Sequence, residues 1–286
     1  MAELRIGTCS WKYPSWEGLV YSKTGKDVNF LEEYAQKYDS VEVDQWFWSL
    51  FPGASPVLPR PATAAEYAAA VGEDFRFSVK APNSLTLTHY YKKKKEEDLA
   101  ANPHFLSVPL FISFLKSLAP LTGRLGPIMF QFEYLNKMKM ASQRQFQKLL
   151  DIFLSALPDG FTWAVESRNP NYLNRSWFDF LAAHRVAHVF LQGYYMPPIT
   201  EIYEKFRESI RGTAVIRLHG SDRDGMEKIT GDRWNTIVAP RNAELPGVVE
   251  MIRDLLKRNV NVYLNVNNHY EGSAPLTIEK LLKLLV

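Results

Sequence analysis

The sequence predicts an α/β protein that folds as a single (β/α)8 TIM-type barrel. Eight short runs rich in β-branched and aromatic residues recur along the 286 residues, and segments with helical spacing of apolar residues separate them. Alternating strands and helices imply a parallel sheet, and eight such units in a chain slightly longer than the typical ~250 residues favour a closed barrel over an open doubly wound sheet. No Gly-rich GxGxxG or GxxxxGK loop follows a strand, which removes the usual nucleotide-binding signature of the open alternative.

The expected elements follow one another regularly along the chain. The expected strands are LRIGTCS (4–10), SVEVD (40–44), FRFSVKA (75–81), PIMFQF (127–132), TWAVESR (162–168), AHVFLQG (187–193), TAVIRLH (213–219) and VNVYLNVNN (260–268). The expected helices are 29–38, 63–71, 111–119, 142–157, 176–185, 247–258 and 277–285. No linker rich in Pro, Gly or Ser and no short repeat interrupts this series, so residues 1–286 are expected to form one domain.

Three connections that come after strands are unusually long. The first spans residues 82–104, the second begins with residues 193–201 and continues beyond them, and the third spans residues 220–245. Long connections in compact domains are usually lids or binding loops, and in a barrel the connections after strands rise from the C-terminal face. We therefore expect function at this end of the barrel, called the mouth below.

The composition excludes several classes of protein. An apolar fraction of 46% fits a globular protein with a core, and a formal net charge of +3 does not indicate a strongly basic nucleic-acid surface. The single cysteine, Cys9, excludes an internal disulfide and a cysteine-based zinc site, and we expect it to be a small buried side chain. No stretch approaches the ~20 apolar residues of a membrane span. We expect a soluble, cytoplasmic protein without membrane contact.

Polar side chains are expected on the inner face of most strands. Successive side chains of a strand point to opposite faces, and the more apolar face is taken as the one that the helices cover. The inward set is then Glu42, Asp44, Arg76, Ser78, Lys80, Met129, Gln131, Glu133, Glu166, Arg168, Arg217, His219, Tyr263, Asn265 and Asn267, and strand 187–193 is ambiguous. A barrel interior normally holds apolar layers, so polar groups near the strand ends predict a wet pocket at the mouth.

Basic side chains in this set favour an anionic ligand. Guanidinium groups bind phosphate or carboxylate bidentately, and Lys80, Arg168 and Arg217 would lie at one mouth. Glu42 or Glu166 would act as general base, with His219 as acid or base near its unperturbed pKa of ~6.5. Amide side chains such as Gln131 would orient the ligand. The leading hypothesis is a hydrolase or lyase that acts on a phosphate- or carboxylate-bearing small molecule.

The order of several motifs resembles that of the YecE-like family, domain of unknown function 72. These motifs are GTCSWKYPSWEGLVY (7–21), YAQKYDSVEVDQWFW (34–48), FRFSVKAPNSLTLTH (75–89), LGPIMFQF (125–132), AVESRNPNYL (164–173), VIRLHG (215–220) and NVNNHYEGSAP (265–275). The resemblance spans nearly the whole chain and implies a TIM-type barrel, but it implies little about activity. The sequence departs from the family pattern at Ser10, where glycine is usual, Asp44 (asparagine), Trp48 (tyrosine) and Asn169 (histidine).

Inward position and resemblance together give the expected site. The expected catalytic residues are Glu42, Glu166 and His219, and the expected substrate-binding residues are Trp11, Tyr13, Lys80, His89, Gln131, Arg168, Arg217, Asn265, Asn267 and Asn268. Neither a metal nor a cofactor is expected. Glu42, Asp44, Glu166, His219 and His89 offer ligand atoms, but no HxH or HExxH spacing occurs and the neighbouring basic side chains would repel a cation.

Other hypotheses stay open at this point. The charged residues could form a closed ion-pair network that only fills the barrel. A metal-dependent phosphoesterase is a further alternative, and a glycosidase would pair Glu42 with Glu166 beneath a platform of aromatic residues. A nucleic-acid-binding protein would use the rim loop 89–95, in which Tyr90 and Tyr91 precede the basic run 92–95, although this run could equally pair with the acidic residues that come after it.

Overall fold

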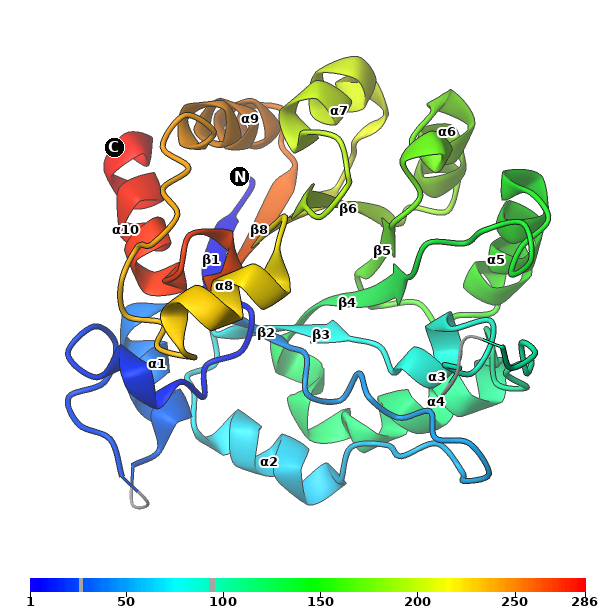
Figure 1. The fold of residues 1–286 in the computed structure, drawn as a ribbon, viewed down its shortest axis with the longest axis horizontal. Helices are drawn as coiled ribbons and strands as arrows, with labels where there is room; N and C mark the ends of the chain where they lie inside the picture. The colour runs from blue at the N-terminus through cyan, green and yellow to red at the C-terminus, as the bar shows by residue number, and fades with distance from the viewer. Residues whose placement is uncertain (26–27, 93–95) are drawn as a thin grey trace.

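Eight parallel strands with helices around them form the TIM-type barrel that the sequence predicts (Figure 1). The computed structural model describes residues 1–25, 28–92 and 96–286. Its strands pair in the order β1-β8-β7-β6-β5-β4-β3-β2. Each strand lies beside the strand that precedes or follows it in the chain, and the first strand, β1, lies beside the last, β8. This is the strand order of a barrel, and it excludes the open doubly wound sheet.

The predicted strands are confirmed to within one or two residues at most ends. They are β1 (Leu4–Thr8), β2 (Ser40–Val43), β3 (Arg76–Lys80), β4 (Leu125–Phe132), β5 (Trp163–Ser167), β6 (Ala187–Gly193), β7 (Thr213–Gly220) and β8 (Asn261–Val266). The α-helices are α1 (Phe30–Lys37), α2 (Pro61–Ala69), α3 (Asn83–Thr86), α4 (Val108–Ser117), α5 (Gln143–Ser155), α6 (Arg175–Ala183), α7 (Ile199–Phe206), α8 (Arg223–Thr230), α9 (Leu245–Lys257) and α10 (Ala274–Leu285). Short 3-10 helices are η1 (Pro14–Trp16), η2 (Ala119–Arg124), η3 (Pro170–Tyr172), η4 (Arg207–Ser209) and η5 (Asn268–Tyr270).

All three of the expected long connections contain helices, the one-turn α3 in the first, α7 in the second and α8 in the third, so the expectation of loops there was wrong. Helix α7 follows Pro198, which occupies its N-cap, and buries Ile199, Tyr203 and Phe206. These positions share one face of a helix, and the run of prolines before them is a helix start signal. Helix α8 begins after Asp222, whose side chain accepts a hydrogen bond from the Gly225 N–H.

The barrel closes between β1 and β2 through side chains more than through a regular ladder. Cys9 and Glu42 form an isolated bridge, and the Ser10 N–H donates to the Glu42 carbonyl at 3.0 Å. Below it, the Tyr34 hydroxyl accepts from the Thr8 N–H at 2.8 Å and donates to the Ser40 carbonyl at 3.0 Å. The strands come so close here that a Cβ built on Gly7 would lie 1.9 Å from the Ser40 carbonyl oxygen.

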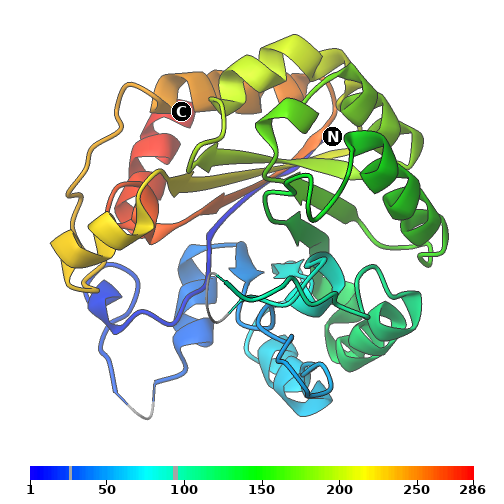
Figure 2. The ribbon, with the colours of Figure 1, turned by 45° about the vertical axis from the view of Figure 1, so that its right-hand side comes forward.

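A second sparse joint lies between β5 and β6. Only Ala164–Ala187 and Val165–His188 pair across it, whereas β6 and β7 pair along five positions. The two joints divide the barrel into one group of strands, β6, β7, β8 and β1, and another, β2 to β5 (Figure 2). Interactions across the barrel centre therefore matter for holding the two groups together.

An apolar layer fills the barrel below the mouth. It consists of Met129, Ala164, Ala187, Val189 and Val215, with Tyr263 packed against it. This layer resolves the ambiguous strand β6, because the alternate residue His188 points outward and packs its ring 4.8 Å from that of Phe178 in α6. Polar residues lie above the layer, as the alternation of side chains predicts.

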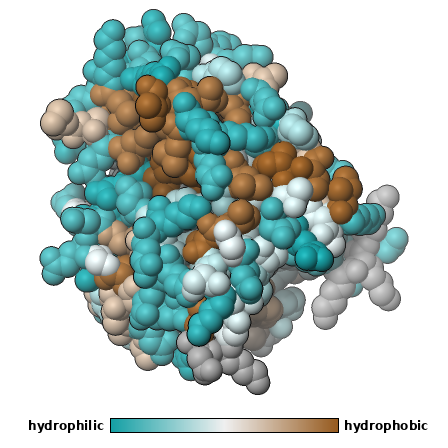
Figure 3. Space-filling model, turned by 90° about the vertical axis from the view of Figure 1, so that its left-hand side faces the viewer, coloured by the Kyte–Doolittle hydropathy of each residue, from teal (hydrophilic) through white to brown (hydrophobic). Residues whose placement is uncertain are grey.

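Apolar side chains also remain on the outer surface. Figure 3 shows them gathered on one side of the molecule at the level of α9 and α10. Leu282 and Leu284 of α10 are exposed, in addition to the residues that α10 buries against the barrel. None of the described helices is long and apolar enough to cross a membrane.

Replacing Gly7 with alanine is expected to destabilise the protein by about 1–3 kcal/mol, because the added methyl group forces β1 and β2 apart. Gly72→Ala is the matched control, since a Cβ at Gly72 meets nothing within 4 Å, and its effect should stay within about 0.5 kcal/mol. Urea unfolding of both variants measures the difference. Equal stability of the two variants would show that the β1–β2 joint tolerates separation.

Candidate functional site

A network of ion pairs centred on Arg217 occupies the barrel above the apolar layer. Arg217 is 1% exposed, and its Nε and Nη2 atoms lie 2.7 and 2.6 Å from the two carboxylate oxygens of Glu42. Its Nη1 donates to Glu166 and, at 3.2 Å, to the side-chain oxygen of Gln131. The other oxygen of Glu166 accepts from the Arg168 Nε at 2.8 Å. These five residues are called the Arg217 network below.

The network keeps the Glu166 carboxylate ionised. Burial alone would raise the pKa of Glu166, but the charges of Arg217 and Arg168 outweigh burial and lower this pKa to about 2. Burial alone would lower the pKa of Arg217. The negative charges of Glu166 and Glu42 outweigh burial and raise this pKa well above its ordinary value. At neutral pH Glu166 therefore carries a negative charge beside the positive charge of Arg217.

The expected anion-binding role of Arg217 does not fit this geometry. Four of the five N–H groups of a guanidinium are engaged by Glu42, Glu166 and Gln131, so no pair of N–H groups is left to bind a phosphate or carboxylate bidentately. The closed ion-pair network, considered from the sequence as an alternative, describes Arg217 correctly.

The expected role of His219 as an acid near neutral pH also needs correction. Burial lowers the pKa of His219 well below its ordinary value, and the nearby positive charges of Arg217 and Arg168 lower it further. The imidazole is therefore neutral at pH 7 and can donate one hydrogen bond and accept another. Its ring lies 6.0 Å from that of Tyr194, a residue that the sequence argument did not include.

Cys9 lies between two of the expected catalytic residues. Its Sγ atom is 3.5 Å from Oε2 of Glu42 and 3.6 Å from Nε2 of His219. Burial and the charge of Glu42 raise the pKa of the Cys9 thiol well above its ordinary value. At neutral pH the side chain is therefore a thiol and not a thiolate. The sequence correctly predicts a buried cysteine but gives no sign of these two neighbours.

Lys80 and Asp44 carry further charges at the mouth. Within the part of the chain that the structure describes, Lys80 forms no hydrogen bond or ion pair, and its Nζ lies 4.1 Å from the centre of the Phe47 ring. Burial and the charge of Arg217 lower the pKa of Lys80, and burial raises the pKa of Asp44. The N–H donors of this ammonium group are therefore not engaged by any other described residue.

Unpartnered amide and hydroxyl groups lie deeper in the barrel. Asn265 is fully buried, and neither its side-chain oxygen nor its nitrogen finds a partner among the described residues. The Ser78 hydroxyl is buried in the same way. A buried polar group without a hydrogen bond costs about 1–3 kcal/mol, so a polar ligand atom or water molecule that reached these atoms would be stabilised by hydrogen bonds to them.

The remaining expected residues are distributed around this centre. The Arg168 guanidinium stacks on the Tyr194 ring at 4.7 Å, and the Tyr13 hydroxyl donates to the Cys9 carbonyl at 3.4 Å. His89 bonds to the Thr88 hydroxyl at 2.9 Å and, among the described residues, has no bond to the network. The structure therefore brings Arg168 and Tyr13 to the mouth and leaves His89 beside it.

Three expected residues have structural contacts that account for them. Trp11 is buried and packs edge-on against Tyr67 of α2 at 5.0 Å. Asn267 accepts from the His269 N–H at the start of η5, and Asn268 accepts from the Ala274 N–H at the start of α10. The side chains of these two asparagines hold the backbone of the segment between β8 and α10, so a structural role accounts for them.

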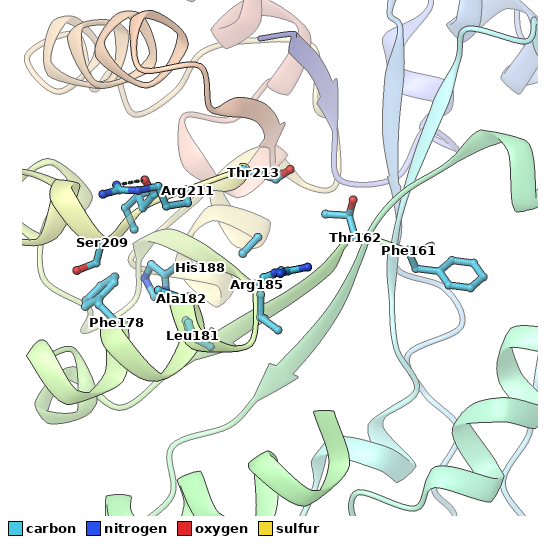
Figure 4. Close-up of a pocket in the computed structure, with 14 residues that line it drawn as sticks. Phe161, Thr162, Phe178, Leu181, Ala182, Arg185, His188, Ser209, Arg211 and Thr213 are labelled. Atoms are coloured by element: carbon cyan, nitrogen blue, oxygen red, sulfur yellow. Dashed lines mark hydrogen bonds between the residues drawn. The ribbon is translucent and has the colours of Figure 1, made fainter. Parts of the chain in front are cut away.

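Two cavities lie at the opposite end of the barrel. One, of about 350 Å³, lies between the starts of β5, β6 and β7 and is lined by Phe178, His188 and Arg211 among others (Figure 4). The second, of about 610 Å³, lies beside the starts of β1 and β3. Sites of TIM barrels lie at the C-terminal ends of the strands, and burial lowers the pKa of His188 to about 3, so neither cavity replaces the mouth as the candidate site.

Exposed aromatic side chains surround part of the mouth. They come after four different strands and are Trp48, Tyr91, Tyr134 and Tyr195, each about half exposed or more. The rings form two pairs, Trp48 with Tyr91 at 6.0 Å and Tyr134 with Tyr195 at 6.1 Å. Residues 93–95 of the expected nucleic-acid loop lie outside the described residues.

The fold and this charged mouth define a TIM-barrel protein with its candidate site at the C-terminal ends of the strands. The model of the family described as "Protein of unknown function DUF72" matches residues 5–286, and the chain belongs to this family, as the resemblance predicted. A DUF72 family protein from Enterococcus faecalis has a TM-score of 0.70 at 19% identity over 99% of this chain and 95% of that chain. One from Thermotoga maritima has a TM-score of 0.67 at 20% identity over 99% of both chains. No curated protein matches the chain.

Replacing Arg217 with methionine is expected to destabilise the protein by about 3–5 kcal/mol, because Glu42 and Glu166 would remain buried without a counter-charge. Arg175→Met removes an exposed ion pair with Asp179 and should cost no more than about 1 kcal/mol. Urea unfolding at pH 7 compares the two. A similar small loss in both variants would contradict the central role of the network.

Acid is expected to weaken the fold through Glu166. Its pKa of about 2 in the folded protein lies below the ordinary 4.5, so its contribution to stability is complete above pH 4.5 and is lost as the pH falls toward 2. Glu166→Gln has no such proton to bind, and its unfolding free energy should therefore fall less steeply over this range. Urea midpoints measured at several pH values give both slopes, and parallel slopes would contradict the prediction.

Proposed function

We propose that this DUF72 protein is an enzyme of the hydrolase or lyase class that binds a small anionic molecule at the barrel mouth. The observation that carries the proposal is the Lys80 ammonium group, which is half-buried at the mouth and forms no hydrogen bond or ion pair with another described residue. A desolvated ammonium group with three free N–H donors favours a phosphate or carboxylate group.

The Arg217 network supports this proposal by fixing the groups around the ligand. Because Glu42 and Glu166 are held by a single guanidinium from β7, their side chains cannot move independently. Glu166 keeps its charge down to low pH, so its proposed role is to accept hydrogen bonds or to stabilise positive charge, and not to donate a proton. Arg168 extends from Glu166 toward Tyr194 and is the second basic group that an anion can reach.

Amide and imidazole groups complete the proposed site. The unpartnered Asn265 amide can both donate and accept, as can the neutral His219 ring, so they suit hydroxyl or carbonyl groups next to the anion. Preorganised polar groups of this kind are typical of enzyme sites. The cytoplasmic location expected from the sequence stays a prediction.

A second candidate, binding of single-stranded nucleic acid, is favoured by the exposed aromatic pairs at the rim. Bases stack on exposed aromatic rings, and phosphates contact basic side chains. Trp48 is 59% and Tyr91 51% exposed, and Tyr91 belongs to the rim loop that the sequence singled out. The ring pairs would equally serve a small ligand that carries a planar ring, so the two candidates need separate tests.

Lys80→Gln is expected to weaken the binding of an anionic probe by about 10- to 100-fold, since one charge-assisted hydrogen bond contributes about 1.5–3 kcal/mol. The probes are inorganic phosphate, glycerol phosphate and lactate, with glycerol as the neutral comparison, and titration calorimetry measures the Kd. Lys116→Gln removes the same charge from an exposed position on α4 and serves as the matched control.

Equal affinities in the two lysine variants would contradict the proposal. Oligothymidylate is titrated in the same assay at low and high salt to separate the second candidate. Binding of the oligonucleotide alone, lost at high salt and unchanged in Lys80→Gln, would favour the nucleic-acid candidate, because contacts with phosphates depend steeply on salt.

A further inference from the structure

Three side chains from different parts of the sequence bring a sulfur, an oxygen and a nitrogen atom together at the mouth. Cys9 comes directly after β1, Glu42 belongs to β2 and His219 to β7. Their ligand atoms all lie within 4.8 Å of one another, and all three side chains are buried. We propose that Cys9, Glu42 and His219 form a binding site for a borderline-soft divalent cation, with Zn²⁺ as the representative ion.

The distances fit a shared metal ion. Zn²⁺ binds sulfur at about 2.3 Å and nitrogen or oxygen at about 2.0–2.2 Å, so two ligands at a tetrahedral angle lie roughly 3.4–3.6 Å apart. The Cys9 Sγ atom lies 3.6 Å from Nε2 of His219 and 3.5 Å from Oε2 of Glu42. Two of the three distances between ligand atoms thus already match the spacing around one ion, and the third, between His219 and Glu42, is at most 4.8 Å.

The choice of ligands fits the ion as well. A thiolate and an imidazole favour Zn²⁺ over Mg²⁺ or Ca²⁺, which prefer oxygen, and three protein ligands leave a fourth position open. Binding breaks the Cys9 S–H bond, forms a sulfur–metal bond and releases the proton to solvent. The sequence argued against a metal because basic side chains such as Arg217 would repel a cation. In the structure, Glu42 and Glu166 form ion pairs with Arg217 and offset its positive charge.

An independent observation points to the same place. Asn265 lies on β8, which pairs with β1 on one side and with β7 on the other. It is in register with Gly7 of β1, two residues before Cys9, and with Arg217 of β7, two residues before His219. Its fully buried amide has no partner among the described residues. An unpartnered polar group one step below the three ligands is suited to bind a water molecule or ligand atom in the open metal position. This metal site does not depend on the role proposed for Lys80.

Titration with Co²⁺ tests the site directly. Cobalt replaces zinc in sites of this kind, and a bound thiolate gives a sulfur-to-cobalt charge-transfer band in the near ultraviolet. The chain has one cysteine, so such a band can come only from Cys9. The reduced full-length protein is expected to show the band with a stoichiometry of one, and Zn²⁺ is expected to abolish it by displacement.

Variants separate metal binding from folding. Cys9→Ser should lose the band, and His219→Asn should weaken Co²⁺ binding by about tenfold or more. Circular dichroism and thermal unfolding without metal establish that both variants are folded, and Lys116→Gln, a change at an exposed position on α4, should keep the band. Absence of the band at saturating Co²⁺ in the folded wild type, or unchanged Co²⁺ affinity in a folded His219→Asn variant, would overturn the proposal.

Discussion

The structure depends on one guanidinium group that neutralises two carboxylates in the centre of the barrel. Arg217 belongs to the group of strands β6, β7, β8 and β1, whereas Glu42 and Glu166 belong to the group β2 to β5. Both joints between these groups have few ladder hydrogen bonds. The ion pairs therefore join the two groups across the interior, and a polar centre replaces the apolar layers that usually fill a barrel. Removing one partner would leave the others buried and uncompensated.

The same network decides which groups can take part in function. Since Arg217 directs its N–H groups to Glu42, Glu166 and Gln131, the most central positive charge is not available to a ligand. The groups that remain lie at its margin: the Lys80 ammonium above it, the Asn265 amide beside it and the Cys9 thiol next to Glu42. A ligand or metal ion would bind around the network, which acts as a fixed support.

The alternation of side chains predicted from sequence which residues face the interior, but it could not predict their pairing. The inward positions of Glu42, Glu166 and Arg217 follow from a period of two, whereas their contacts depend on strand order and shear, which no local pattern contains. The environment of His219 is also non-local, so its lowered pKa was missed. Ser10 has a φ of 69°, which is a left-handed backbone conformation. Glycine adopts this conformation most readily, which accounts for the glycine that the family resemblance implies at this position.

Asp44 narrows the kind of ligand that the mouth can bind. The charges of Glu42, Asp44 and Glu166 act on Lys80, and Glu42 and Glu166 also form ion pairs with Arg217. Such a site does not attract a polyanion by charge alone, because acidic groups lie near its basic ones. Under the proposed function, a suitable molecule would carry a single anionic group for Lys80 and a hydrogen-bond donor for Asp44. Asparagine, which is usual at this position in the family, would lack that negative charge, and the two side chains should therefore select different ligands on the same barrel.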